Sequence, residues 1–243
     1  MTQYSIALSN YMQRCHASAT PRAALFDMDG TLYDSMPNHV KAWQQMLRES
    51  GIEVEPAELL LAEGRTGTDT VRQVFMRHLG REISDEDCRR LYRRKAELFT
   101  AMPPVTLMPG AQKLVKAVRD AGLTTVLVTG SGQGSLLDRL EEDFPGAFPQ
   151  SRRVTAYNVS RGKPAPEPYL KGMEIASVLP QQSIAFDNAP LGVRSACDAG
   201  ALTIGVVTGP IPSQSLSDAG ADIVFTSMPE CADTIAEALN LAI

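Results

Sequence analysis

The sequence predicts an α/β fold in which a doubly wound parallel sheet carries an all-helical insert. Two observations predict it. Short apolar segments that end at polar or acidic residues alternate with amphipathic segments, which is typical of a parallel sheet with crossover helices. Residues 37–103 break this alternation, because they read as consecutive helices with no convincing strand between them. Such an insert between the first two strands is expected to form a separate domain.

The expected strands place several polar residues at one edge of the sheet. Four apolar segments are expected to be strands: 23–26, 124–128, 184–186 and 202–207. The amphipathic segments 110–121 and 190–199 are expected to be helices between them. Right-handed crossovers then give a doubly wound sheet, which binds ligands at the carboxyl ends of its strands. This rule brings Asp27, Thr129 and Asp187 to the same edge.

The chain therefore divides into a core and a cap. The core is expected to comprise residues 1–36 and 104–243, and the cap residues 37–103. Helices are expected in the cap at 37–50, 68–79 and 84–101. Prolines interrupt regular structure at 34–37 and 103–104, which marks two hinges. Residues 1–20 are an N-terminal extension, expected to form a short amphipathic helix packed on the core.

Composition excludes several classes of function. A net charge of −5 and a pI near 5.3 argue against a sequence-independent nucleic-acid binder, which would need a basic face. The four cysteines are scattered without zinc spacing, which favours reduced thiols. No signal peptide or membrane-spanning segment is evident, so we expect a cytoplasmic protein without a membrane partner. The oligomeric state stays open.

Asp27 and Asp29 carry the strongest chemical signal. They begin the segment Asp27-Met28-Asp29-Gly30-Thr31, directly after an apolar strand. A first aspartate at a strand end can attack phosphorus and form an aspartyl-phosphate. A second, two residues later, can protonate the leaving oxygen and then deprotonate the incoming water. An isolated pair of this kind would be better explained as a cap of the turn.

Further segments supply what such a reaction needs. Thr129, Gly130 and Ser131 follow an apolar strand, and their hydroxyl and backbone amides are suited to holding phosphoryl oxygens. Lys163, on a proline-stiffened loop, is a compact cation for the nucleophile and the transferring group.

A metal site is expected at the fourth segment. Asp187 and Asn188 end another strand and offer oxygen ligands for a hard cation such as Mg²⁺. Each of the four segments has an ordinary explanation, such as a turn, a solvated loop charge or a helix cap. Their occurrence together, in this order, favours a magnesium-dependent phosphoryl-transfer enzyme.

Together the four segments resemble the haloacid dehalogenase superfamily of phosphotransferases, over most of residues 23–208. The resemblance implies a Rossmann-like core with a helical cap domain between strands one and two. It also implies Mg²⁺ held by Asp27, the backbone carbonyl of Asp29 and the fourth motif. Asp29 is typical of phosphatases and mutases, because the dehalogenases proper lack that acid. The segments 162–166 and 188–193 are most similar to β-phosphoglucomutase-like members.

Three positions depart from the β-phosphoglucomutase pattern. The fourth motif of that subgroup usually has two adjacent acids, whereas this chain has Asn188 as the second residue. In the cap, Glu63 stands where β-phosphoglucomutases have a basic residue, and Gly67 stands where they have an arginine. In those enzymes the basic residue and the arginine help to bind a sugar-linked phosphate. A cap carboxylate with an asparagine in the fourth motif instead resembles haloacid dehalogenase-type inorganic pyrophosphatases. We hypothesise that Glu63 reaches the metal when the cap closes; the alternative is a charge at a helix end.

Other cap residues are candidates for the substrate site. His39 matches a histidine that assists proton transfer in β-phosphoglucomutases, and its alternative is a partly exposed surface residue. Arg65 could contact a distal phosphate. Lys95 has a counterpart in the caps of this family but could equally be a solvated charge.

The favoured function is a Mg²⁺-dependent phosphohydrolase that acts through an aspartyl-phosphate on a small phosphorylated substrate, with inorganic pyrophosphate as one candidate. The alternative is a β-phosphoglucomutase, an isomerase of hexose phosphates. A third class, an inactive phosphate-binding module, is disfavoured because Asp27, Asp29, Thr129, Lys163 and Asp187 are all present. The physiological substrate stays open.

Overall fold

The computed structural model describes residues 3–14 and 20–240, and its centre is a six-stranded parallel sheet. The strands lie in the order β5-β4-β1-β6-β7-β8. Their bounds are β1 Ala23–Phe26, β4 Thr124–Val128, β5 Arg153–Val154, β6 Ser183–Asp187, β7 Leu202–Val206 and β8 Ile223–Phe225. Because the order reverses at β1, the sheet is doubly wound, and the predicted Rossmann-like fold class is confirmed.

Strand register brings the polar strand ends together. Phe26 of β1 pairs with Leu127 of β4 on one side and with Phe186 of β6 on the other. The next residues, Asp27 and Asp187, therefore leave the sheet side by side at its carboxyl edge. This is the position that the strand pattern predicted.

Alternate strand residues pack against helices on both faces of the sheet. On one face, α6 Ala111–Asp120 and α12 Met228–Asn240 cover residues such as Phe26 and Ile184. On the other, α9 Glu167–Ala176 and α10 Pro190–Asp198 cover Leu25 and Ala185. The smaller elements of the core are α7 Gly134–Leu137, α8 Leu140–Asp143, α11 Ser213–Asp218 and the 3₁₀ turns Gln150–Arg152 and Pro180–Gln182.

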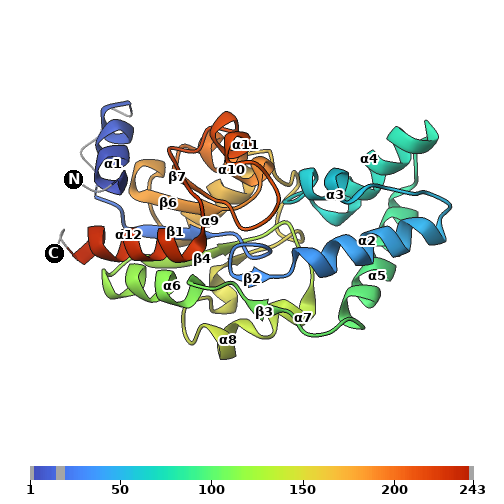
Figure 1. Ribbon diagram of the computed structural model, residues 1–243, viewed down its shortest axis with the longest axis horizontal. Coiled ribbons are helices and arrows are strands. Elements are labelled where there is room, and N and C mark those ends of the chain that lie inside the picture. The colour runs from blue at the N-terminus through green and yellow to red at the C-terminus, as the bar shows by residue number, and fades with distance from the viewer. Residues whose placement is uncertain (1–2, 15–19, 241–243) are drawn as a thin grey trace.

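The N-terminal helix packs on the core, as expected of the extension. It spans Gln3–Arg14 (α1) and lies beside α12 at the end of the molecule far from the cap (Figure 1). Tyr4 and Tyr11 are buried, and the Tyr11 hydroxyl donates a hydrogen bond to the carbonyl of Gly200. The remaining part of the predicted extension, residues 1–2 and 15–19, lies outside the described residues.

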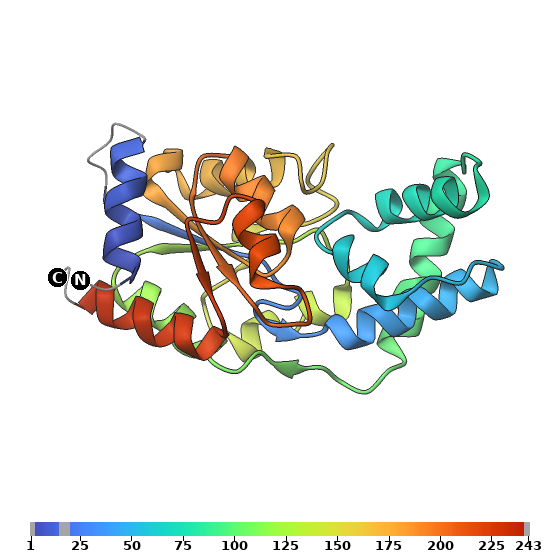
Figure 2. The same cartoon turned by 45° about the horizontal axis from the view of Figure 1, so that its top comes forward.

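Four helices form the cap beyond the carboxyl edge of the sheet (Figure 2). They are α2 Met36–Glu49, α3 Pro56–Leu61, α4 Gly67–Leu79 and α5 Asp85–Thr100. Helix α5 packs against both α2 and α4. A two-stranded antiparallel ribbon of β2 Tyr33–Asp34 and β3 Thr106–Leu107 ties together the two crossings between core and cap.

Several short elements were not predicted. Strands β5 and β8 are two and three residues long, and helix α3 has six residues, so none presents enough periodicity to be read from sequence. Within the described ranges, no helix has the length and apolar character needed to cross a membrane. Cys88, Cys197 and Cys231 are free thiols, and Cys15 lies outside the described residues.

Candidate active site

Lys163 joins the two carboxylates at the edge of the sheet. Its Nζ donates hydrogen bonds to Asp27 Oδ1 at 2.6 Å and to Asp187 Oδ2 at 2.8 Å. The Lys163 side chain is fully buried, so its charge is balanced by these carboxylates instead of by water. The Tyr169 hydroxyl also donates to Asp187 Oδ2, at 2.6 Å, which fixes that carboxylate from α9. Tyr169 is a site residue that no sequence motif indicated.

Burial and the opposite charge of the ion-pair partner shift the pKa values of Asp27 and Lys163 in opposite directions. Burial raises the pKa of Asp27 to about 8, and repulsion from Asp187 and Asp29 adds to the rise, whereas Lys163 opposes it. For Lys163, burial favours the neutral amine, but the two carboxylates outweigh it and raise its pKa. Lys163 is therefore a permanent cation beside Asp27.

Asp29 faces the cap and receives two hydrogen bonds. Its Oδ1 accepts from Ser35 Oγ at 2.7 Å and lies 2.8 Å from His39 Nε2. His39 Nδ1 lies 2.5 Å from Lys95 Nζ, so the three residues form a chain that leads from the core into the cap. With Lys95 as a charged donor, Nδ1 must accept, which leaves the proton of His39 on Nε2 and pointing at Asp29.

This chain keeps Asp29 ionised. Burial alone would raise the pKa of Asp29, but His39, Ser35 and Lys95 together lower it to about 2. Burial and the Lys95 charge lower the pKa of His39. Burial also lowers the pKa of Lys95 to about 7, partly opposed by Asp29.

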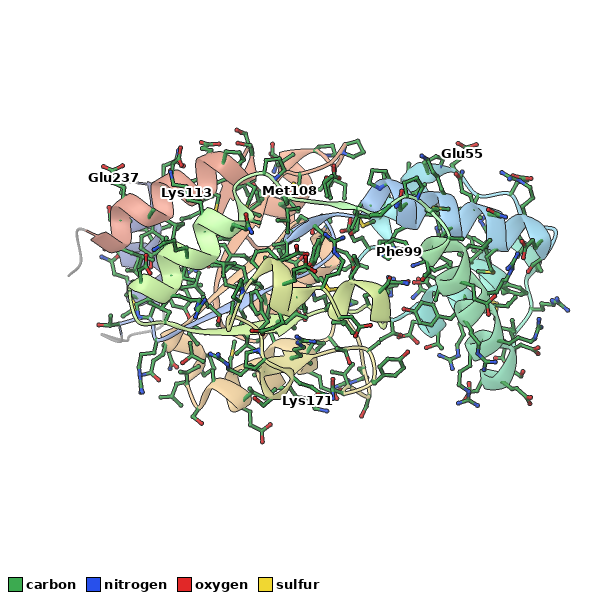
Figure 3. All side chains as sticks on the ribbon, turned by 90° about the horizontal axis from the view of Figure 1, so that it is seen from below. Glu55, Phe99, Met108, Lys113, Lys171 and Glu237 are labelled. Atoms are coloured by element: carbon green, nitrogen blue, oxygen red, sulfur yellow. The ribbon has the colours of Figure 1, made fainter. Side chains whose placement is uncertain are left out.

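His39 and Lys95 are enclosed by aromatic side chains of the cap. The His39 ring lies 4.3 Å from that of Phe99, which Figure 3 labels on α5 at the side of the cap that faces the core. Lys95 Nζ lies 5.3 Å from the centre of the Trp43 ring and 5.2 Å from that of Phe99. Both residues are buried, so the alternatives of an exposed histidine and a solvated lysine are wrong.

The loop after β4 lies directly under the cap. Thr129 Oγ1 accepts a hydrogen bond of 3.0 Å from the backbone amide of Ser131, and the amide of Gly132 donates to the Tyr92 hydroxyl of the cap at 2.9 Å. A Cβ on Gly130 would lie 2.1 Å from the carbonyl oxygen of Gly64. Only glycine permits this approach, so the cap is closed on the loop.

Glu63 enters the core site from the cap. Its Oε1 accepts a hydrogen bond of 2.9 Å from Asn188 Nδ2, and Asn188 Oδ1 accepts one of 3.1 Å from Thr31 Oγ1. Gly30, with φ of +80°, makes room, because a Cβ there would lie 2.2 Å from Asn188 Nδ2. Burial, together with Asp27, Asp187 and Asp29, raises the pKa of Glu63 well above its ordinary value. Glu63 is thus not a solvated helix-end charge.

A small cavity of about 60 Å³ remains beside Asp29, between core and cap. His39, Trp43, Glu63 and Ser131 are among the residues that line it. A cavity of this size holds only a few water molecules. A larger leaving group would therefore require the cap to open.

The comparisons with known proteins agree with this geometry. Residues 21–200 match the family model described as haloacid dehalogenase-like hydrolase. The chain belongs to this family. Hexitol phosphatase A of Escherichia coli is similar to this haloacid dehalogenase-like chain, with 31% identity over 85% of this chain and 91% of the relative. The beta-phosphoglucomutase of Mycobacterium bovis is 28% identical over 86% of this chain and 90% of its own length.

A solved structure extends the similarity to the whole fold. A Bacteroides vulgatus protein, provisionally described as a beta-phosphoglucomutase, superposes with a TM-score of 0.91 and 38% identity, covering 98% of each chain. The resemblance inferred from the motifs is confirmed.

The donor set of this haloacid dehalogenase-like site suits a hard cation. Within the part of the chain that the structure describes, no three His, Cys, Asp or Glu side chains form a ready metal cluster. The carboxylates of Asp27 and Asp187 nevertheless converge on one lysine nitrogen, and the Asn188 amide and Glu63 carboxylate adjoin them. These are all oxygen donors of the kind that Mg²⁺ prefers, so the residues fit the expected ion.

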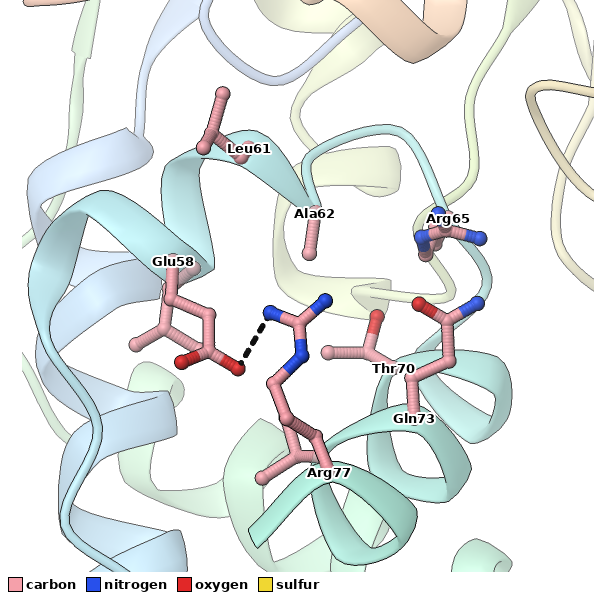
Figure 4. A pocket seen from close by; sticks show the side chains of 9 residues that line it. Glu58, Leu61, Ala62, Arg65, Thr70, Gln73 and Arg77 are labelled. Atoms are coloured by element: carbon pink, nitrogen blue, oxygen red, sulfur yellow. Dashed lines mark ion pairs between the residues drawn. The ribbon is translucent and has the colours of Figure 1, made fainter.

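Arg65 is the candidate that the structure places elsewhere. Its side chain lines a separate cavity between α3 and α4 (Figure 4), and it is not among the residues around the cavity beside Asp29. In the closed arrangement Arg65 is therefore not positioned to contact a substrate at Asp27. Ser35, Tyr92 and Tyr169 take part in the site although the sequence did not indicate them, because each acts only through contacts with residues distant in the chain.

Proposed function

We propose that this protein is a Mg²⁺-dependent phosphatase that hydrolyses a small phosphorylated sugar or polyol through an aspartyl-phosphate. The observation that carries this proposal is that the two aspartates have different hydrogen-bond partners. Asp27 is held by Lys163, whereas Asp29 is held by His39 of the cap. These different partners support Asp27 as the nucleophile and Asp29 as the group that transfers protons.

In the first step, an Asp27 carboxylate oxygen attacks phosphorus, and the bond from phosphorus to the leaving oxygen breaks. Lys163 holds the carboxylate in place and offsets its charge, while the Thr129 hydroxyl and the Gly130 backbone amide would donate to the phosphoryl oxygens. The leaving oxygen takes its proton through Asp29. Because Asp29 is ionised in the free chain, that proton comes from His39 Nε2, and Lys95 Nζ replaces it at His39 Nδ1.

In the second step, water attacks phosphorus and the bond to Asp27 breaks, which releases phosphate and restores the carboxylate. The Asp29 carboxylate, which is ionised in the free chain, accepts the proton of that water and passes it to His39, and His39 returns its Nδ1 proton to Lys95. Closure of Gly64 onto Gly130 excludes other water from the site.

Mg²⁺ would be held by Asp27, the backbone carbonyl of Asp29, Asp187 and Asn188, with Glu63 close enough to contribute. When bound, such an ion neutralises charge on the phosphoryl oxygens. Lys163 supplies the fixed positive charge of the protein itself at the same point.

The substrate class rests on the relatives, and the closed cap suggests a second candidate. Hexitol phosphatase A, by its name, acts on a phosphorylated polyol, and it aligns with 85% of this chain. Inorganic pyrophosphate is the second candidate, because the small cavity and the contact between Glu63 and Asn188 favour a compact leaving group. The buried chain of His39 and Lys95 and the likeness to beta-phosphoglucomutases make the isomerase the remaining alternative.

One panel of assays separates these functions. Phosphate release is measured with hexitol phosphates, hexose 6-phosphates and pyrophosphate, each with Mg²⁺ and with a chelator, while a coupled assay follows conversion of β-glucose 1-phosphate to glucose 6-phosphate. We expect metal-dependent release, fastest from a sugar or polyol phosphate. Rapid isomerisation with only slow release would replace the phosphatase by the mutase, and fastest release from pyrophosphate would establish the second candidate.

A further inference from the structure

A second cavity lies inside the cap, apart from the catalytic residues. It occupies about 130 Å³ between α3 and α4 (Figure 4). Leu59, Ala62 and Val74 give it an apolar wall. Its polar lining consists of Glu58, Arg65, Thr70, Gln73 and Arg77. The reaction proposed above uses none of these side chains.

Arg65 is the unexplained group in this cavity. Its Nε is buried and has no hydrogen-bond partner, and no ion pair of its side chain occurs among the described residues. Burial lowers the pKa of Arg65, and repulsion from Arg77 adds to this, with only Asp69 opposing. A buried guanidinium nitrogen without an acceptor carries a cost that a bound anion would remove.

The other charges of the lining leave it positive. Glu58 is the only carboxylate in the lining, and it already accepts ion-pair contacts from Arg77 at 3.0 Å and from His78 at 3.1 Å. Arg65 is therefore the cation whose charge is not matched within the cavity. Figure 4 shows the Gln73 amide directed toward Arg65, which adds a neutral donor beside the guanidinium.

From these features we infer that the cavity between α3 and α4 is a binding site for a small oxyanion of the phosphate or carboxylate type. Arg65 would donate to two of its oxygens from the N–H groups along one edge of the guanidinium, and Gln73 would donate to a third. The volume admits a single such group with a short apolar body against Leu59 and Val74. A large ligand such as a nucleotide is excluded by size.

The position of the site connects it to the catalytic loop. Glu63 and Arg65 lie two residues apart, and Glu63 contacts Asn188 in the core while Arg65 turns back into the cap. Gly64, between them, rests against Gly130. A ligand on Arg65 would therefore contact the same loop that closes the active site.

The Arg65 Nε–H resonance offers a direct test in the wild-type chain. The signal is assigned by its loss in Arg65→Lys and followed by NMR during titration with orthophosphate and, separately, with malonate. We expect a saturable shift with one or both anions, and the stronger response identifies the preferred oxyanion. Because Arg65 shares a loop with Glu63, each titration is repeated in chelator with Asp27→Asn, and a shift that persists there is assigned to the cap cavity; the test stands even if the chain hydrolyses nothing.

Two matched variants complete the experiment. Arg65→Gln should weaken anion binding at this site about tenfold, as expected for loss of a charge-assisted pair, measured by the shift of the neighbouring Gln73 side-chain amide. Arg90→Gln removes the same charge from α5 at an exposed residue outside the cavity, paired with Asp87, and should change binding less than about twofold. No saturable shift at Arg65, or equal weakening by both variants, would overturn the proposal.

Discussion

Glu63 of the cap accepts a hydrogen bond of 2.9 Å from Asn188 of the core, although the two residues are 125 positions apart in the chain. The contact joins the cap to the motif expected to bind metal. It places the Glu63 carboxylate beside the neutral residue of that motif, as the hypothesis that Glu63 reaches the metal requires.

An additional acid at position 188 should make the free chain depend on metal. Asn188→Asp places a carboxylate against the buried Glu63 and loses the donor that now links them, so the metal-free protein should lose about 1–3 kcal/mol of unfolding free energy. Mg²⁺ should recover much of this loss, because it pairs with both carboxylates. Chemical unfolding with and without Mg²⁺ measures the effect.

Asn10→Asp is the control for Asn188→Asp, since it makes the same charge change at an exposed position of α1. This variant should have nearly the same free energy of unfolding as the wild type, both with and without Mg²⁺. Equal stability of Asn188→Asp and the wild type without metal would mean that Glu63 does not face position 188 in solution.

Loss of the nucleophile should abolish turnover without unfolding the chain. Asp27→Asn cannot form the acyl phosphate, so phosphate release should fall by about 10³-fold or more. Asp29→Asn retains the nucleophile and should slow release of phosphate from the intermediate. Mass spectrometry of the quenched Asp29→Asn protein should then show one added phosphoryl group, and its absence from Asp27→Asn identifies the attachment site.

Binding of Mg²⁺ should release protons near neutral pH. Burial raises the pKa of Asp27 to about 8 in the metal-free chain, so below that pH the site carries a proton that the ion must displace. Proton release should therefore be large at pH 7 and small at pH 9. Calorimetry in buffers of different ionisation enthalpy measures it, and Asp27→Asn should release fewer protons than the wild type at pH 7.

The buried Lys95 should make stability depend on pH. Burial lowers its pKa from 10.5 to about 7, so between these values the unfolded chain holds a proton that the folded chain has lost. The contribution of this site to stability therefore rises with pH from about 7 to 10.5 and is lowest below pH 7. Lys95→Met removes the effect, so the stability of the wild type relative to the variant should increase between pH 6 and pH 9.

Urea unfolding of both proteins in chelator at the two pH values measures this change. The exposed Lys116, replaced by Met, gives a control whose difference from the wild type should not vary with pH. The same difference at pH 6 and pH 9 for Lys95→Met would contradict a lowered pKa for Lys95.

The sheet could be predicted from sequence because its strands are uniformly apolar and end at polar residues. The apolar segments that end at Phe26, Val128 and Phe186 are each followed by a polar residue, which marks the end of the strand. Parallel pairing brings those ends to one edge of the sheet. Strands β5 and β8 were missed because two or three residues are too few to show the hydrophobic pattern of a strand. Helix α3 was missed for a similar reason, since six residues make fewer than two turns.

Within the site, the candidate residues could be predicted from the sequence, but their hydrogen-bond partners could not. The sequence indicated Asp27, Asp29 and Lys163 by residue type and order. Ser35 and Tyr169 are ordinary residues of a helix start and a helix, and only packing brings their hydroxyls onto Asp29 and Asp187. Such hydroxyls leave no signal in a single sequence, because their role depends on distance in space.

The candidate reactive groups, and the edge of the sheet on which they gather, can be read from the amino-acid sequence, because both follow from local pattern and strand pairing. Which cap side chains join them depends on how the chain packs in three dimensions. Glu63 and Arg65 are both charged and lie two residues apart, yet one enters the core site and the other turns into the cap. The intervening Gly64 has φ of +89°, a backbone turn that residue type permits but does not specify, and contact with Gly130 and Asn188 selects it.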